Sequence, residues 1–332
     1  MNDGSPRRPP RLRGWLAAAA TLLLLAGVAG FRTLRPAEVH QVARQPYPQG
    51  PGPSSRMPGR MPNLPLIVDG VLRVFAEPYQ VRADAPLSRR YPTSPFWSLR
   101  RWPQQLLGVA AVGRLVLTRW SDGVLLALDA PTGAVAWRLA GPPPAAGAGH
   151  DDRATGARTV RAPEGLHTAG DVVAVAGGRE FVAVDGRGAV RWRRPLPECL
   201  RSTFGTADAR LVHVAGCAAP RLLFVDARTG ADAGAWAPGG AGADAAVEPL
   251  GCGPAVSDCH GMRVRAGGRA AGYLLAGARP VAAPALADPA ALLVPRPGAA
   301  PLAVRVADGA VVAAHARDGA PAWRWRPARA LI

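Results

Sequence analysis

The chain has 332 residues, is 48% hydrophobic, and carries 40 basic against 23 acidic residues, a formal net charge of +17. This length can bury one large core or two ordinary ones. Every basic residue is an arginine, which excludes classes that need a lysine: Walker-type phosphate-binding loops, Schiff-base enzymes and protein kinases. A generally basic surface is the simplest interpretation of the charge. The arginines are scattered rather than interleaved with aromatic residues, so an anionic lipid surface or cell-envelope polymer is favoured over nucleic acid.

Residues 14–31 form an uncharged, apolar run that is just long enough to cross a bilayer as a helix. The positive-inside rule then predicts a single-pass cell-membrane protein with residues 1–13 in the cytoplasm and the C-terminal body outside. The arginines that set this orientation are Arg7, Arg8, Arg11 and Arg13. A cleaved signal peptide is the alternative, with small residues at 28–30 as the cleavage site. Residues 32–64 are rich in proline and glycine and predict an extended linker.

Two short apolar runs, separated by glycine turns and closed by a tryptophan, form a unit that recurs along the chain. The clearest copy is "DGVLLALDAPTGAVAW", from Asp122 to Trp137. Its Asp-Gly and Thr-Gly pairs supply the positive φ that tight turns need. Its apolar runs do not alternate, which indicates strands covered on both faces. The residues expected to define the repeats are Asp122, Gly123, Asp129, Gly133, Trp137, Gly188, Trp192, Asp226, Gly230, Trp236, Gly319 and Trp323.

The later copies are imperfect. The copy that ends at Trp236 has two extra residues before its tryptophan, and the last copy is expected to have Ala316 in place of the aspartate. The closing tryptophans follow at intervals of 55, 44 and 87 residues. The last interval is about twice the second, which indicates that one copy between Trp236 and Trp323 has lost its tryptophan. Residues 262–277 are the candidate for this copy, with Tyr273 in the position of the aromatic residue.

A period of about 40–50 residues built from short strands and glycine turns is typical of a β-propeller. We predict an all-β propeller of four-stranded blades over residues 65–332, behind a single N-terminal transmembrane helix. Six to eight blades are compatible with the spacing, and seven is the preferred number. Residues 65–100 are expected to add a further blade or the strand that closes the ring.

The repeat resembles the pyrroloquinoline-quinone-like (PQQ-like) β-propeller family, in the membrane-anchored type found in high-GC Gram-positive bacteria. The matching positions are Asp122-Gly123, residues 127–130, Thr132-Gly133 and Trp137, and the resemblance extends from about residue 105 to the C-terminus. The family includes quinone-dependent alcohol dehydrogenases and propellers without a cofactor, so the resemblance implies a fold rather than a function. Its quinone enzymes use adjacent cysteines and a calcium ligand set that includes asparagine. This chain has no adjacent cysteines and no asparagine after residue 63, so we expect no cofactor.

Four cysteines in an exported domain predict disulfides. Of the three pairings, Cys199–Cys217 and Cys252–Cys259 are favoured, because each pair falls within one predicted blade. The alternative is a zinc site that uses Cys252, Cys259 and His260, although this spacing matches no common zinc motif.

Just before the first clear repeat, Trp97, Arg100, Arg101 and Trp102 form a cationic and aromatic group. Packing against the ring is the favoured interpretation, and a binding surface is the alternative. No catalytic residue, cofactor site or metal site is predicted from the sequence.

We therefore expect a membrane-anchored extracytoplasmic propeller that acts as a non-catalytic binding or scaffolding module for another envelope protein or an anionic envelope polymer. The alternative is a quinoprotein-type oxidoreductase that uses the central funnel. A third hypothesis is an extracellular sensor that works with a separate kinase.

Overall fold

The computed structural model describes residues 20–27, 30, 37–47, 65–84, 95–149, 157–277, 279–296 and 298–326. Residues 20–27 are helical. No helix within these ranges is long and apolar enough to span a membrane. The expected transmembrane segment 14–31 lies mostly outside the described residues, so the anchor stays a prediction.

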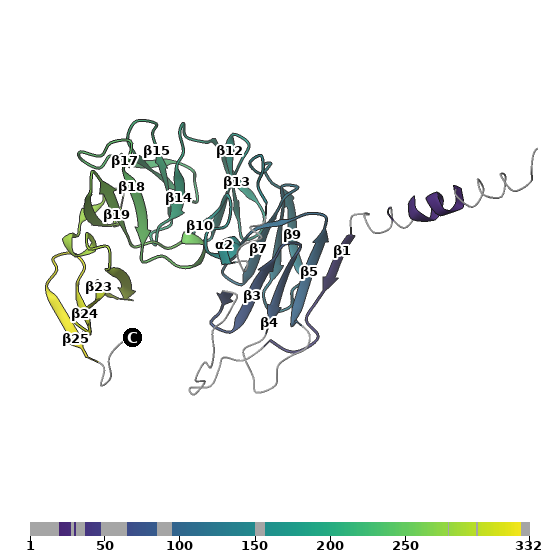
Figure 1. The fold of residues 1–332 in the computed structure, drawn as a ribbon, viewed down its shortest axis with the longest axis horizontal. Coiled ribbons are helices and arrows are strands. Elements are labelled where there is room, and N and C mark those ends of the chain that lie inside the picture. Colours follow the sequence, from purple (N-terminus) through teal and green to yellow (C-terminus); the bar gives the residue numbers. More distant parts are fainter. Residues whose placement is uncertain are drawn as a thin grey trace, which may run out of the picture.

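The described chain is built almost entirely from six antiparallel sheets that follow an arc (Figure 1). The first sheet has five strands in the order β1-β5-β4-β3-β2, and each of the others has four strands in sequence order. The strands of the first sheet are β1 (Ala37–Gln41), β2 (Leu66–Val68), β3 (Leu72–Glu77), β4 (Gln80–Asp84) and β5 (Trp97–Trp102). Those of the second are β6 (Leu106–Val112), β7 (Leu115–Trp120), β8 (Val124–Asp129) and β9 (Val135–Ala140).

Three short helices and sixteen further strands complete the described part. The third sheet comprises β10 (Leu166–Ala169), β11 (Val172–Gly177), β12 (Glu180–Asp185) and β13 (Val190–Pro195), and α2 (Ala157–Arg161) precedes it. The fourth comprises β14 (Ser202–Gly205), β15 (Arg210–Ala215), β16 (Arg221–Asp226) and β17 (Asp232–Trp236). The fifth comprises β18 (Ala246–Leu250), β19 (Gly261–Ala266), β20 (Arg269–Leu274) and β21 (Val281–Ala282), with η1 (Pro254–Val256) inside it and η2 (Pro284–Leu286) after it. The sixth comprises β22 (Leu292–Arg296), β23 (Ala299–Ala307), β24 (Ala310–His315) and β25 (Pro321–Trp325).

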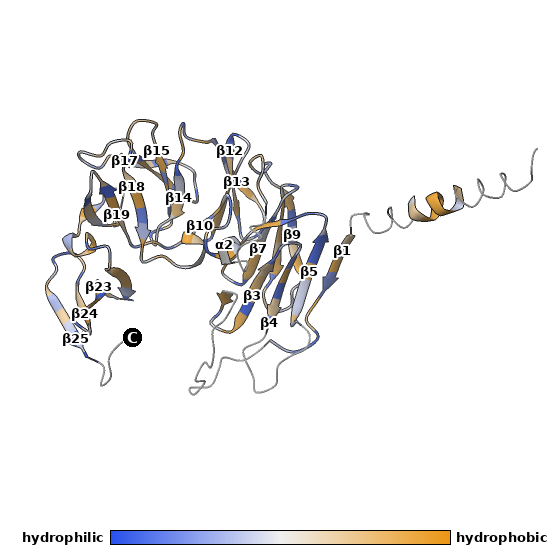
Figure 2. Cartoon of the chain, viewed as in Figure 1, coloured by the Kyte–Doolittle hydropathy of each residue, from blue (hydrophilic) through white to orange (hydrophobic). Residues whose placement is uncertain are grey.

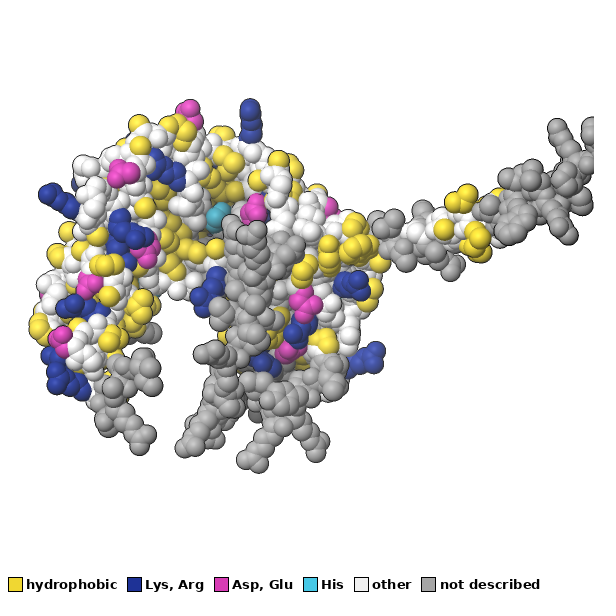
Figure 3. All heavy atoms as spheres, in the orientation of Figure 1, with side chains coloured by type: hydrophobic (Ala, Val, Ile, Leu, Met, Phe, Trp, Pro, Cys, Tyr) yellow, Lys and Arg dark blue, Asp and Glu magenta, His cyan; other side chains and the backbone are white. Residues whose placement is uncertain are grey.

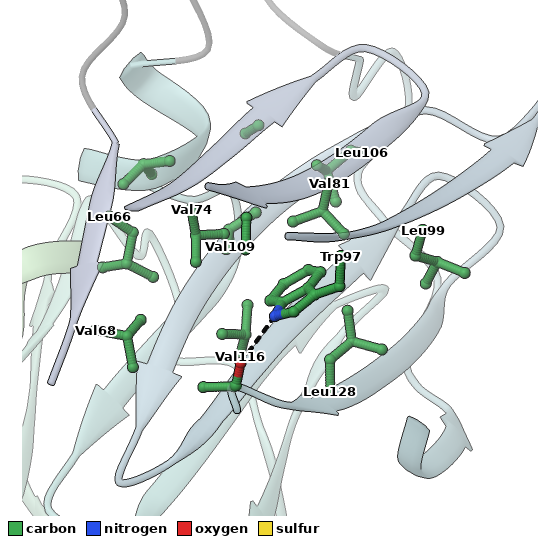
Figure 4. Close-up of a cluster of buried hydrophobic side chains, with 14 of the residues drawn as sticks. Leu66, Val68, Val74, Val81, Trp97, Leu99, Leu106, Val109, Val116 and Leu128 are labelled. Atoms are coloured by element: carbon green, nitrogen blue, oxygen red, sulfur yellow. Dashed lines mark hydrogen bonds between the residues drawn. The ribbon is translucent and has the colours of Figure 1, made fainter. Parts of the chain in front are cut away.

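The central strands of the second to fifth sheets are buried on both faces because each of these sheets packs between two neighbours. Strand β8 is buried over its four central residues, and orange segments lie along the inner strands of the sheets in Figure 2. Separate hydrophobic clusters fill the spaces between successive sheets. Figure 4 shows the cluster between the first and second sheets, where Trp97 lies among Val81, Val116 and Leu128.

This all-β arrangement of blade-like sheets is consistent with a β-propeller. Residues 65–84 and 95–102 form β2 to β5, so this region adds a further sheet, one of its two expected roles. The described residues contain six sheets, which leaves the preferred number of seven blades unconfirmed. In Figure 1 the first and last sheets stand at opposite ends of the arc.

Part of the expected linker 32–64 forms a strand. Residues 37–41 form β1 and pair in antiparallel register with β5, from Ala37 opposite Trp102 to Gln41 opposite Ser98. Two polar side chains of β1 explain why this short strand is held. Glu38 accepts hydrogen bonds from Arg101 and Arg138, and His40 Nε2 lies 2.7 Å from the carbonyl oxygen of Gly133.

Candidate functional site

Three tryptophans each join their own sheet to the next one. In every case the indole Nε1 donates a hydrogen bond to the carbonyl that follows the aspartate at the end of the next sheet's third strand. Because the donor and the apolar ring come from one side chain, each contact combines burial of a large surface with a satisfied polar group. The three contacts are Trp97 with Ala130 O at 2.8 Å, Trp137 with Gly186 O at 3.0 Å and Trp192 with Ala227 O at 2.8 Å.

The turn glycines of the repeats form the surface on which these indoles dock. Gly133, Gly188 and Gly230 have φ values of 71°, 80° and 73°, which is the backbone conformation expected from the sequence. A Cβ atom at these positions would lie only 2.5–2.8 Å from the Cγ atom of the docked tryptophan. Glycine is therefore required both for the turn and for the close approach of the ring. The repeat pattern in the sequence predicted the turn conformation of these glycines but not their contact with the indoles.

The aspartates of the repeats stabilise the turns. Asp122 accepts a hydrogen bond from the Val124 N–H, beside Gly123 with φ 81°, and Asp129 accepts one from the Thr132 hydroxyl at 2.7 Å. Asp226 accepts hydrogen bonds from the backbone N–H and the hydroxyl of Thr229, which lower the pKa of its carboxyl group. Asp122 also forms an ion pair with Arg101 of the first sheet. The three carboxylates do not converge on a site.

Three details of the expected repeats are corrected by the strand registers. Gly234 lies opposite Phe224, at the position where Trp192 lies opposite Ala183, so Trp236 lies two residues beyond the docking position. Tyr273 lies on the third strand of its sheet rather than the fourth, and packs edge-on against Trp236 from the other side.

In the last repeat, the residue at the aspartate position is His315 and not Ala316. His315 ends β24 and its carbonyl accepts a hydrogen bond from the Gly319 N–H, as the Asp226 carbonyl does from Gly230. Gly319 has φ 74°, but no atom of the described residues lies within 4 Å of the position of its Cβ, so none of the described indoles docks there. Trp323 lies in register with Ala313, as Trp137 does with Ala127, and is 47% exposed.

The cationic and aromatic group before the repeats is divided between the two faces of β5. Trp97 is buried and docks on the second sheet, and Arg101 is buried, with ion pairs to Glu38 and Asp122. Trp102 packs against the Tyr79 ring at 4.6 Å on the opposite face, and Arg100 is exposed. The packing interpretation thus describes Trp97 and Arg101, and the four side chains do not form a common surface.

The cysteines form two disulfides, Cys199–Cys217 and Cys252–Cys259, which is the favoured pairing. The first closes the start of the fourth sheet, and the second closes a loop of the fifth sheet. No cysteine remains to ligate zinc, since none is free.

Two buried arginines were not indicated by the sequence. Arg119 on β7 donates to the carbonyl of Glu164, and Arg263 on β19 donates to the carbonyls of Leu286, Asp288 and Ala291. Burial lowers the pKa of Arg119 to about 10. Each arginine links its sheet to the backbone that leads into the next one, so both are structural.

A cavity of about 430 Å³ lies between the third and fourth sheets. Its apolar lining comes from Pro195 at the end of β13, from Pro197 just after it, and from the face of β16. Its polar lining comes from Arg194, His213, Arg221 and Asp232. Arg194 donates to the Gly230 carbonyl and, at 2.7 Å, to the Asp232 carboxylate, and thereby bridges the two sheets.

His213 is held as a neutral ring at this cavity. Its Nδ1 atom lies 3.1 Å from the Thr203 hydroxyl, and its ring stacks on Phe181 with centroids 4.5 Å apart. Burial, together with the charge of Arg194, lowers the pKa of His213 to about 4. Burial also lowers the pKa of nearby His167, to about 3. Neither histidine was singled out by the sequence, because each is isolated along the chain.

The sixth sheet carries an apolar face. The strand registers place Leu292, Val304, Ala313 and Trp323 in one row across this sheet, with Val306 and Trp325 in the adjacent row. Leu292, Val306 and Trp325 are more than half exposed. Figure 3 shows hydrophobic side chains at the surface in the region of β23 to β25.

Residues 121–247 match the family described as outer membrane protein assembly factor BamB. These residues carry PQQ-like propeller repeats. The match includes the docking turns at Gly133, Gly188 and Gly230 and ends within β18, the first strand of the fifth sheet. It says nothing about the membrane-anchored type. No curated protein matches the chain.

Several solved structures are similar to the chain. BamB from Moraxella catarrhalis has 16% identity and a TM-score of 0.44, over 79% of this chain and 72% of that one. The dihydro-heme d1 dehydrogenase NirN in complex with DHE has 15% identity and a TM-score of 0.45, over 80% of this chain and 56% of that one. The WD40 domain of Toxoplasma gondii coronin has 11% identity and a TM-score of 0.46, over 76% and 66%. Similarity at this level carries no argument about function.

The residues present do not fit a quinone site of the type that the family's dehydrogenases use. The cysteines form two disulfides between residues that are distant from one another in sequence, so none supplies the adjacent-cysteine disulfide. Within the described ranges, no group of three or more His, Cys, Asp or Glu side chains could hold a metal ion.

Proposed function

We propose that the protein is a membrane-anchored, extracytoplasmic β-propeller that binds another protein of the cell envelope and performs no catalysis of its own. Residues 14–31 would form the anchor, with residues 1–13 in the cytoplasm and the sheets outside. The expected orientation follows from the arginines before the apolar run. The two disulfides support an oxidising compartment.

The exposed row of the sixth sheet is the observation that carries the binding role. In the second sheet the equivalent row is Ala110, Leu117, Ala127 and Trp137, and the third sheet covers it. In the sixth sheet no further described sheet covers this row: Leu292 and Trp323 are exposed, Val304 is half-buried, and only the small side chain of Ala313 is buried. Trp323 donates no hydrogen bond to a carbonyl among the described residues. A contiguous apolar face of this kind marks an interaction surface.

The chemistry of this face favours a protein over an anionic polymer as the partner. Its centre presents two indoles and aliphatic side chains, whereas the arginines lie around it and partly in ion pairs, such as Arg305 with Asp288. Interface centres are depleted in charge and enriched in tryptophan. The partner surface would be a flat sheet face that offers a backbone carbonyl to Trp323, by analogy with the three indole contacts inside this molecule.

Site-specific photo-cross-linking of the full chain in membranes tests this proposal. A photoreactive phenylalanine analogue replaces Trp325, and in the matched control it replaces Arg187, an exposed residue of the third sheet. We expect one identified envelope protein to cross-link from position 325 only, and Leu292→Asp to remove that product. Cross-linking to polymer or lipid alone, or the same products from both positions, would contradict the proposal.

A further inference from the structure

The cavity between the third and fourth sheets breaks a pattern that the preceding spaces follow. Two residues after each docking tryptophan, the outer strand places another side chain toward the next sheet. This residue is Leu99 after Trp97 and Leu139 after Trp137, and both pack in the hydrophobic clusters. After Trp192 it is Arg194. A charged residue at a position that is otherwise apolar costs folding energy, and such exceptions concentrate at functional sites.

The facing sheet breaks the pattern at the same place. His213 on β15 points toward the third sheet, where it stacks on Phe181. The residue in the equivalent register of the second sheet is Thr118, so a larger ring that can hydrogen-bond stands where the second sheet has a small side chain. Arg194, His213 and Asp232 therefore form a polar group between the third and fourth sheets. No such group occupies the equivalent positions between the first and second sheets or between the second and third.

The charges of the lining define the ligand. Arg194 and Arg221 contribute two positive charges and Asp232 one negative charge, and neutral His213 adds none, which leaves a net charge of +1. Arg194 is fixed by Gly230 and Asp232, whereas Arg221 has no hydrogen-bond or ion-pair partner among the described residues. A monoanion balances this charge, and a guanidinium group binds a carboxylate through two parallel hydrogen bonds.

The apolar lining and the volume of the cavity indicate what the ligand carries besides its negative charge. Leu223, Val225, Pro195 and Pro197 give the cavity an apolar wall. The volume of about 430 Å³ lies within the range of small-molecule sites, about 300–1,000 Å³. We infer that this cavity binds a small carboxylate with a short branched apolar group, with the carboxylate on Arg221 and the apolar group against Leu223 and Val225. This site is separate from the exposed face of the sixth sheet.

Such a carboxylate has two sources: a free short-chain acid, or the C-terminus of a peptide. Isothermal titration calorimetry of the full chain in detergent distinguishes them with 4-methylpentanoate and N-acetyl-leucine, and N-acetyl-leucine amide is the uncharged control. Binding of the free acid alone assigns the first source, and binding of N-acetyl-leucine assigns the second. The inference is overturned if neither acid binds, or if the amide binds as tightly as the acid.

Two variants separate a specific site from general attraction to a basic protein. Arg221→Gln removes an exposed side chain without disturbing the core, and we expect affinity to fall about tenfold or more. Arg228→Gln removes an exposed charge of the same sheet that does not line the cavity and should leave affinity unchanged. Leu223→Trp should fill the cavity and abolish binding. Equal losses in the two arginine variants would overturn the inference, and the photo-cross-linking result at position 325 would be unaffected.

Discussion

Trp192 and Gly230 join two sheets through one contact. The indole of Trp192 lies on the Cα atom of Gly230, and its Nε1 donates to the Ala227 carbonyl at 2.8 Å. Trp97 with Gly133 and Trp137 with Gly188 repeat this relationship. The cohesion of the first four sheets thus depends on a tryptophan in one sheet and a glycine in the next.

Gly230→Ala should destabilise the protein strongly. The new Cβ atom would lie 2.7 Å from Trp192 Cγ, and the residue would also have to keep a φ of 73°. Overpacking costs about 1–3 kcal/mol, in addition to about 1–2 kcal/mol for a left-handed alanine. Gly319→Ala is the matched control, because its φ is 74° and its surroundings are open. Urea unfolding should show a larger loss for Gly230→Ala, and equal losses would mean that the indole does not constrain the glycine.

Tryptophans of the docked and exposed classes should differ in their contribution to stability. Trp97→Ala removes a fully buried ring and its hydrogen bond and should cost about 3–5 kcal/mol. Trp325→Ala removes a ring that is 54% exposed and should cost less than about 1 kcal/mol. Thermal unfolding of both variants measures the difference. A large loss for Trp325→Ala would show that the last sheet is covered by another part of the chain.

Stability should depend on pH through His213. Its pKa is lowered from 6.5 to about 4 by burial and by Arg194, so the unfolded chain binds a proton more readily than the folded protein between these values. The contribution of the neutral ring is complete above pH 6.5 and is lost progressively as the pH falls to 4. This loss amounts to about 3 kcal/mol.

Chemical denaturation from pH 7.5 to 4 measures this effect. His213→Gln should reduce the dependence in that interval and leave the part due to His167, whose pKa is also lowered by burial, whereas His315→Gln on the sixth sheet should leave the full dependence. A profile for His213→Gln that is parallel to the wild type would assign the dependence to other groups, of which His167 is the nearest candidate.

The disulfides should contribute unequally to stability. Their sequence separations are 18 residues for Cys199–Cys217 and 7 for Cys252–Cys259. The loop-entropy relation then gives about 3 and about 2 kcal/mol, respectively. Paired Cys→Ser variants, compared by urea unfolding, should show this order. The reverse order would indicate that packing around the buried Cys259 outweighs loop closure.

The sequence predicted the all-β fold because its strongest signals are local. Glycine turns such as those at Gly123 and Gly133 set hairpins, and the apolar run of β8 requires cover on both faces. The contact of Trp192 with Gly230 could not be predicted from the sequence, because the spacing within one repeat does not show which residue of the next repeat contacts the tryptophan. Trp236 shows the limit of pattern matching: it closes a repeat in the sequence, but Gly234 occupies the docking position.

The polar groups between sheets were missed for a similar reason. His213, Arg194 and Asp232 belong to three different strands, and only the packing of two sheets brings them to one cavity. None of the three residues stands out within the sequence of its own strand. The repeat did contain one usable signal, because Arg194 replaces the leucine found two residues after Trp97 and Trp137.

Strand β1 changes where a recombinant fragment of this protein should begin. A fragment starting at residue 65 would leave the edge of β5 bare and would deprive Arg101 of the Glu38 carboxylate. Uncovered strand edges promote association between molecules. A fragment that starts before Ala37 retains the edge strand, so the choice of first residue decides whether the isolated sheets stay monodisperse.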